Sequence, residues 1–191
     1  MKNIFVLFFI LSTFTIHLSA KEIVTENATV QLVANSESDF NKGQIAVHYK
    51  LRPLWHIYWL NPGDSGAAPK FQIDGASIAP IAWPMPKRIP VSHLVNFGYE
   101  DEVLIFLDLP SSFAGKSLDL EWLVCKVDCV PGFGSIALEQ KNVRIDSTLF
   151  QKFKDRVPQK IKQKGLLHQE TPDFIDIVVP GLSINLSLIH I

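Results

Sequence analysis

Two cysteines, Cys125 and Cys129, are the residues of this chain whose type and spacing point to chemistry. A disulfide needs Cα atoms about 4.4–6.8 Å apart, whereas four residues of a straight strand span roughly 13 Å. The two sulfurs can therefore join only where the chain turns or bulges between them. Lys126, Asp128 and the following Pro131-Gly132 are compatible with such a turn.

A bond between these cysteines would brace the fold only weakly. The loop-entropy relation gives about 2 kcal/mol for a five-residue loop, against about 4.7 kcal/mol for a 100-residue loop. The same closeness makes reversible opening easy, because neither sulfur has to travel far. Lys126 favours a thiolate nearby and Asp128 opposes it. The residues alone favour redox exchange slightly, and an inert structural bridge stays open as the alternative.

Copper binding is a second alternative for the cysteine pair. The spacing, followed by Val-Pro, loosely resembles the copper site of Sco-type proteins, and soft thiolates suit Cu(I). Such a site adds a distant histidine, for which this chain offers His48, His56, His93 and His168. It also lies on a thioredoxin-like fold, in which a helix follows the cysteines, whereas here Pro131-Gly132 and the strand-like residues 135–138 follow. Two ligands alone make an incomplete site, so we predict no metal.

No other set of residues predicts a catalytic centre. The Asp64-Ser65-Gly66 segment has the composition of a turn, so Ser65 is not predicted to be a nucleophile. His56, between two tryptophans, is more typical of an ordinary packed side chain than of a base. No Ser/His/Asp arrangement or phosphate-binding glycine loop can be assigned, and no cofactor is predicted.

The pattern that must position the cysteines is one of short strands. Between residues 22 and 140 apolar residues recur with period two, as in Ile45-Val47-Tyr49-Leu51 and Leu118-Leu120-Trp122-Val124. Glycine- and proline-rich turns separate these runs. Many short strands separated by such turns predict an all-β fold, an antiparallel sandwich or barrel.

The C-terminal part changes character. From Asp146 to Val157 apolar residues follow one helical face, with Asp146 or Ser147 as N-cap and Pro158 ending the helix. Residues 159–171 are polar and lysine-rich and predict a linker, and 174–179 predict a new strand. The predicted division is therefore 21–145 for the sandwich, 146–170 for helix and linker, and 171–185 for the start of an incomplete domain. Residues 186–191 resemble the translation of a sequencing-library adapter.

The first twenty residues predict export. Lys2 precedes the apolar run 4–11, and Leu18-Ser19-Ala20 offers a small residue at the cleavage point, as in a signal peptide. An exported pair of cysteines meets oxidising conditions. The formal net charge of −1 gives no electrostatic reason to expect nucleic acid as a partner.

Five motifs, in this order, carry a family resemblance over about residues 22–145. They are Trp55-His-Ile-Tyr-Trp59, Asn61-Pro-Gly-Asp-Ser-Gly66, Trp83-Pro-Met-Pro-Lys-Arg-Ile-Pro90, Leu94-Val-Asn-Phe-Gly-Tyr-Glu100 and Trp122-Leu-Val-Cys-Lys-Val-Asp-Cys-Val-Pro-Gly132. Together they resemble the N-terminal periplasmic domain of the DsbD/ScsB thiol–disulfide interchange proteins, and most closely the ScsB-like branch.

The resemblance implies an immunoglobulin-like β-sandwich that serves as the redox module of a protein-disulfide reductase. Its cysteines, on neighbouring strands, would receive electrons from a transmembrane domain and a C-terminal thioredoxin-like domain of an inner-membrane protein. They would pass them to thioredoxin-fold clients in the periplasm. The family is also linked to copper tolerance and cytochrome c-type biogenesis.

The resemblance further implies roles for individual residues. The family's C-terminal cysteine corresponds to Cys129, which we predict to attack the client. In DsbD an aromatic on a cap loop covers the disulfide, and the matching residues 96–99 make Phe97 the cap candidate and Tyr99 the reserve. One departure stands out: DsbD separates its cysteines by five residues, whereas three separate them here.

Overall fold

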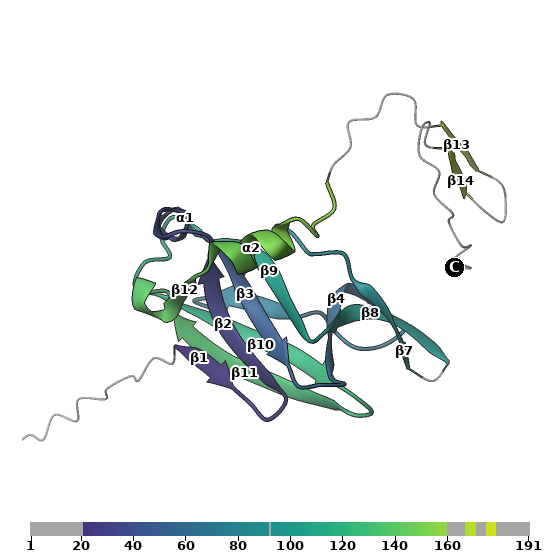
Figure 1. Ribbon diagram of the computed structural model, residues 1–191, viewed down its shortest axis with the longest axis horizontal. Coiled ribbons are helices and arrows are strands. Elements are labelled where there is room, and N and C mark those ends of the chain that lie inside the picture. The colour runs from purple at the N-terminus through teal and green to yellow at the C-terminus, as the bar shows by residue number, and fades with distance from the viewer. Residues whose placement is uncertain (1–20, 92, 160–166, 171–174, 179–191) are drawn as a thin grey trace, which may run out of the picture. The chain divides into compact units, whose positions relative to one another are not determined.

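The computed structural model describes residues 21–91 and 93–159 in full, and the backbone of 167–170 and 175–178 (Figure 1). The chain divides into two units, Met1–Pro158 and Gln159–Ile191, which are treated separately. The predicted signal peptide and the adapter-like residues 186–191 lie outside the described residues.

The first unit is a sandwich of two sheets, as predicted. Its five-stranded sheet has the order β1 (Glu22–Val24), β2 (Ala28–Ala34), β3 (Gln44–Leu51) and β9 (Glu102–Asp108), with β12 (Val143–Ile145) parallel beside β2. The seven-stranded sheet has the order β6 (Ala76–Ser77), β5 (Lys70–Ile73), β10 (Ser117–Cys125), β4 (His56–Gly63), β8 (Leu94–Glu100) and β7 (Lys87–Val91), with β11 (Cys129–Ala137) beside β10. The immunoglobulin-like all-β fold expected from the resemblance is confirmed.

Alternate side chains along each strand point inward and form the core between the two sheets. In β10 the side chains of Leu118, Leu120, Trp122 and Val124 are all buried. The Trp122 ring meets the Tyr49 ring of β3 edge to face, with centroids 5.7 Å apart, so this pair joins the two sheets. Because side chains alternate, the odd-numbered residues of β10 lie on the outer face of the seven-stranded sheet.

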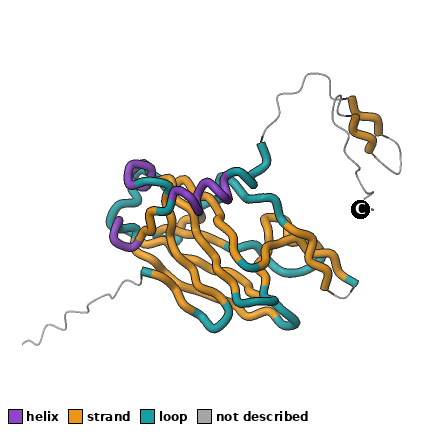
Figure 2. The backbone as a smooth tube through the Cα atoms, in the orientation of Figure 1, coloured by secondary structure: helices purple, strands orange, loops and turns teal. Residues whose placement is uncertain are grey.

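Helix α2 (Ser147–Lys154) packs onto the sandwich and extends the domain. The Asp146 carboxylate caps it by accepting a hydrogen bond from the Leu149 amide at 2.9 Å. Phe153 is fully buried in the core, and the Phe150 ring packs edge to face on Phe106. The compact unit therefore reaches Pro158, beyond the predicted end at 145. Two short helices, α1 (Glu37–Asn41) and the 3₁₀ helix at Gln140–Asn142, complete it, and Figure 2 shows how strands dominate the domain.

The second unit contains a two-stranded antiparallel hairpin. Strand β14 (Ile175–Val178) lies within the strand predicted at 174–179, which is thereby confirmed. Strand β13 (Leu167–Glu170) falls within the predicted linker, because pairing with the apolar β14 overrides the polar composition of this segment. Among the residues that the structure describes, no helix is long and apolar enough to cross a lipid bilayer.

A chain of polar contacts through the Glu102 carboxylate connects α2 to the five-stranded sheet. His48 Nε2 lies 3.0 Å from Glu102 Oε2, and Lys152 Nζ of α2 lies 2.7 Å from Glu102 Oε1. Burial holds the pKa of His48 below its usual value, although Glu102 acts in the opposite direction. The hydrogen bond from Lys152 lowers the pKa of Glu102. His48 is therefore neutral, and Glu102 ionised, at neutral pH.

We expect the stability of the domain to fall as the pH is lowered from about 7 to about 5. The unfolded chain protonates His48 at about pH 6.5, whereas the folded chain resists protonation until a lower pH, so acid favours unfolding. His56 is shifted in the same direction. Urea unfolding across this range should therefore give a free energy of unfolding whose dependence on pH is weaker in His48→Gln, with His93→Gln, a substitution of an exposed turn residue, as the control. If His48→Gln shows the same dependence of the free energy of unfolding on pH as the unaltered protein, His48 is not its cause.

Candidate functional site

The two cysteines close the hairpin between β10 and β11. Cys125 is the last residue of β10 and Cys129 the first of β11, and the two are paired directly across the ladder. The structure joins their sulfurs in a disulfide, with Cα atoms 4.1 Å apart. The Lys126 amide donates to the Asp128 carbonyl at 3.2 Å, so a tight turn separates the cysteines, as the spacing predicts.

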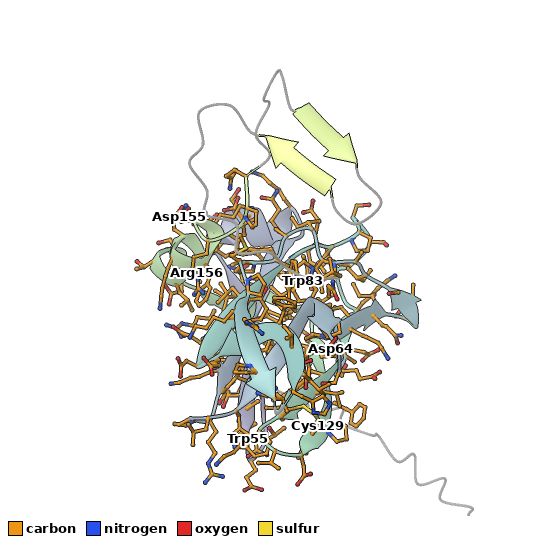
Figure 3. All side chains as sticks on the ribbon, turned by 90° about the vertical axis from the view of Figure 1, so that its right-hand side faces the viewer. Trp55, Asp64, Trp83, Cys129, Asp155 and Arg156 are labelled. Carbon is orange, nitrogen blue, oxygen red and sulfur yellow. A yellow bond between two sulfur atoms is a disulfide. The ribbon has the colours of Figure 1, made fainter. Side chains whose placement is uncertain are left out.

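The two sulfur-bearing residues differ in exposure. Cys125 is 2% exposed, whereas Cys129 is exposed to solvent. In Figure 3 Cys129 lies with Trp55 at the lower end of the domain, away from Asp155 and Arg156. Exchange begins with a thiolate that reaches one sulfur, so an incoming thiolate meets Cys129 first.

Strand β4 supplies the side chains next to the disulfide. His56 lies directly opposite Cys125 in the ladder, and Tyr58 follows on the same face. The Tyr58 hydroxyl lies 3.7 Å from Cys129 Sγ, and the side chain is almost completely buried. Tyr58, which the sequence did not single out, is therefore an aromatic residue in contact with the disulfide.

The glycine-rich segment after β4 covers Tyr58. Gly66 has a φ of +87°, and a Cβ there would lie 2.2 Å from Cζ of the Tyr58 ring, so only glycine fits. The Asp64 carboxylate accepts from the Val95 amide at 2.7 Å, and the Ser65 hydroxyl donates to Asn96 Oδ1 at 3.1 Å. These contacts are those of a structural turn, in agreement with the prediction for this segment.

The two cap candidates lie in strand β8 and not in a loop, which corrects the expected local structure. Residues 96–99 are paired with both β4 and β7, and this double pairing keeps them extended. Tyr99 is buried in the core and its hydroxyl donates to the Pro84 carbonyl at 2.7 Å; burial raises its pKa. The Phe97 ring packs on Trp59. Gly98 is the register partner of Tyr58, so alternation directs Phe97 and Tyr99 to the opposite face of β8.

The histidines proposed as copper ligands are spread over the chain. His48 is paired with Glu102, His93 lies in the turn between β7 and β8, and the backbone of His168 lies in β13. His56 alone of these is placed beside a cysteine by a strand pairing. In the described part of the chain, no three His, Cys, Asp or Glu side chains form a group suited to hold a metal ion.

A hairpin disulfide with one exposed and one buried cysteine, on an immunoglobulin-like sandwich, has the arrangement of a thiol–disulfide exchange module. Residues 20–141 match the family model described as "Thiol:disulfide interchange protein DsbD, N-terminal". This match spans more than half of the chain, and the chain belongs to this family of DsbD N-terminal domains. The resemblance carried by the five motifs is thereby confirmed.

Two solved structures are similar to this chain. The N-terminal periplasmic domain of ScsB from Proteus mirabilis superposes with a TM-score of 0.60 and 21% identity, covering 81% of this chain and 65% of that one, so this chain spans just under two thirds of its length. This likeness shows the shared fold. The reduced DsbD N-terminal domain of Neisseria meningitidis gives a TM-score of 0.38 at 14% identity, covering 56% of this chain and 83% of that one. No curated protein matches the chain.

Proposed function

We propose that this domain relays two electrons through Cys125 and Cys129, from a thioredoxin-like donor domain to client disulfides in the periplasm. The observation that carries the proposal is the disulfide across a hairpin, with one exposed and one buried cysteine. Membership of the family of DsbD N-terminal domains supports it.

The difference in exposure assigns an order to the steps. A donor thiolate attacks Cys129 Sγ, the Cys125–Cys129 bond breaks, and Cys125 leaves as a thiolate. The donor's second thiol then releases the domain as a dithiol. In the forward step the Cys129 thiolate attacks a client disulfide and forms a mixed disulfide. Cys125 attacks Cys129 Sγ, reforms the original bond and releases the client as a dithiol.

The wider relay is part of the same proposal. The family resemblance supports a donor in a C-terminal thioredoxin-like domain, supplied through a transmembrane domain of an inner-membrane protein. It equally supports thioredoxin-fold clients in the periplasm, with roles in copper tolerance or cytochrome c-type biogenesis. No nucleic acid or cofactor enters this scheme.

The test is whether the disulfide exchanges at all. We expect the purified protein, equilibrated with mixtures of reduced and oxidised glutathione or with a reduced thioredoxin, to give a reduction potential above about −300 mV. A small bridge in a local loop contributes only about 2 kcal/mol to stability, so the reduced protein should stay folded. A potential below about −300 mV, with no exchange with thioredoxin, would identify an inert structural bridge and overturn the proposal.

A further inference from the structure

His56 lies beside the redox pair and has no part in the exchange scheme above. It is the direct register partner of Cys125, and residues directly opposite on antiparallel strands hold their Cβ atoms about 4.5–5.5 Å apart. Its ring meets the Tyr58 ring edge to face at 5.3 Å, and the Tyr58 hydroxyl in turn contacts Cys129 Sγ. The three elements β4, β10 and β11 therefore bring His56, Tyr58 and the two cysteines onto one face.

The His56 side chain is buried without a full set of partners. It is 5% exposed, and its Nε2 has no hydrogen-bond partner among the described residues. A buried ring nitrogen without a partner costs about 1–3 kcal/mol, and folded proteins rarely keep such groups without a reason. A ligand, a bound water or a chemical role can account for this nitrogen, and the adjacent thiol chemistry suggests the last.

The exchange scheme contains a proton that has to be removed inside the domain. In the dithiol state Cys125 is a buried thiol, and burial disfavours its thiolate. Cys129, exposed to water, can lose its proton to solvent, whereas Cys125 must become a thiolate while a client covers the site. The resolving step therefore needs a proton acceptor close to Cys125.

We propose that His56 accepts the proton of Cys125 in the resolving step. This proposal rests on the proposed function. The Cys125 S–H bond breaks as the proton passes to the imidazole; the sulfur attacks Cys129 Sγ of the mixed disulfide; and the client sulfur leaves with the bonding electron pair. The imidazolium then returns the proton to the departing client thiolate. Two electrons and two protons reach the client, the second proton coming from solvent.

The electrostatic surroundings keep His56 in the form that this role needs. Burial lowers the pKa of His56, while Glu100, its partner on β8, acts in the opposite direction. The Glu100 carboxylate is itself paired with Lys87 Nζ at 3.1 Å. The imidazole is therefore neutral at neutral pH, with one ring nitrogen able to accept a proton. The remaining titratable groups of β4 and of the elements packed beside it are those of Tyr58, Tyr99, Asp119, Glu121 and Cys129, and the hairpin turn adds Lys126 and Asp128.

A coloured aromatic disulfide, dithiobis-nitrobenzoate, separates the two chemical steps. One equivalent mixed with the reduced protein releases one coloured thiolate when Cys129 attacks and a second when Cys125 resolves the mixed disulfide. We expect His56→Asn to leave the first phase unchanged and to slow the second about 100-fold near neutral pH. In the variant, the rate of the second phase should rise tenfold per pH unit, because hydroxide replaces the base. His93→Asn, on an exposed turn, is the matched control.

The outcomes distinguish this proposal from the proposed function. Equal second phases in His56→Asn and the unaltered protein, at every pH, would overturn the role of His56 but leave electron relay intact. Absence of a second phase in the unaltered protein would overturn the relay itself. If His56→Asn does not fold, His56→Gln and the pH profile of the unaltered protein decide. A second-phase rate that falls with acid only below about pH 6.5 supports the proposal. A second-phase rate that rises with the ionisation of a thiol overturns it.

Discussion

We expect Cys125→Ser to trap the client on the domain and Cys129→Ser to leave the client untouched. In the proposed scheme, the first variant keeps the exposed Cys129, which attacks a client disulfide, but lacks the buried Cys125, which resolves the product. It should therefore accumulate as a mixed disulfide with a thioredoxin-fold partner, while net transfer falls to the background rate. The second variant keeps only the sulfur of Cys125, which is 2% exposed, so it should form almost no mixed disulfide.

The measurement is non-reducing electrophoresis after mixing each reduced variant with an oxidised thioredoxin-fold partner, followed by mass spectrometry of the linked peptides. The double variant Cys125→Ser/Cys129→Ser controls for non-covalent association. A mixed disulfide through Cys125 in the Cys129→Ser protein, formed as fast as that through Cys129, would reverse the assigned roles. It would also show that the hairpin opens widely enough to expose both sulfurs.

The sequence predicted the site to the extent that local geometry determined it. Spacing alone required a turn between Cys125 and Cys129, and the structure has one. The alternation of Leu118, Leu120, Trp122 and Val124 predicted a strand that the structure contains, and the sandwich follows from many such strands. These features depend on contacts within a few residues or on a simple period.

The neighbours of the disulfide depended on strand order, which no local pattern contains. His56 and Tyr58 alternate with the core residue Ile57, so their shared face was readable from the sequence. The position of β4 beside the end of β10 could not be read from the sequence, because the two strands are far apart in the chain. Without the strand order, Phe97 and Tyr99 were expected in a loop. Pairing with both β4 and β7 instead makes their segment an inner strand of the sheet.

The end of the domain shows a related limit. The helix and its Asp146 cap follow from local chemistry, but the burial of Phe153 requires knowledge of the surface on which the helix packs. That surface is made by β2 and β9, which come much earlier in the chain. A boundary set by the last strand-like residue therefore ends before the core does.

The second large effect expected concerns Trp122, which supports the hairpin from the core side. Its side chain is 1% exposed and packs on Tyr49 of the opposite sheet. It lies against its cross-strand partner Gly132, where a Cβ would fall 2.2 Å from Cε2 of the indole. Trp122→Ala removes this packing and leaves a cavity between the sheets, so we expect a loss of about 3–5 kcal/mol in the free energy of unfolding.

Denaturant unfolding of the oxidised protein measures this loss, with Phe133→Ala on the same hairpin as the matched control. Phe133 is 64% exposed, so its truncation should change stability by less than about 0.5 kcal/mol.

Trp122→Ala should also raise the alkylation rate of Cys125 in the reduced protein, because a loosened β10 admits water to a sulfur that the rigid hairpin keeps away from solvent. A large loss of stability with no change in Cys125 reactivity would mean that the outer face, through His56 and Tyr58, protects the sulfur by itself. Loss of under about 1 kcal/mol would instead show that the sheets are held together elsewhere, since a fully buried tryptophan that joins them cannot be removed so cheaply.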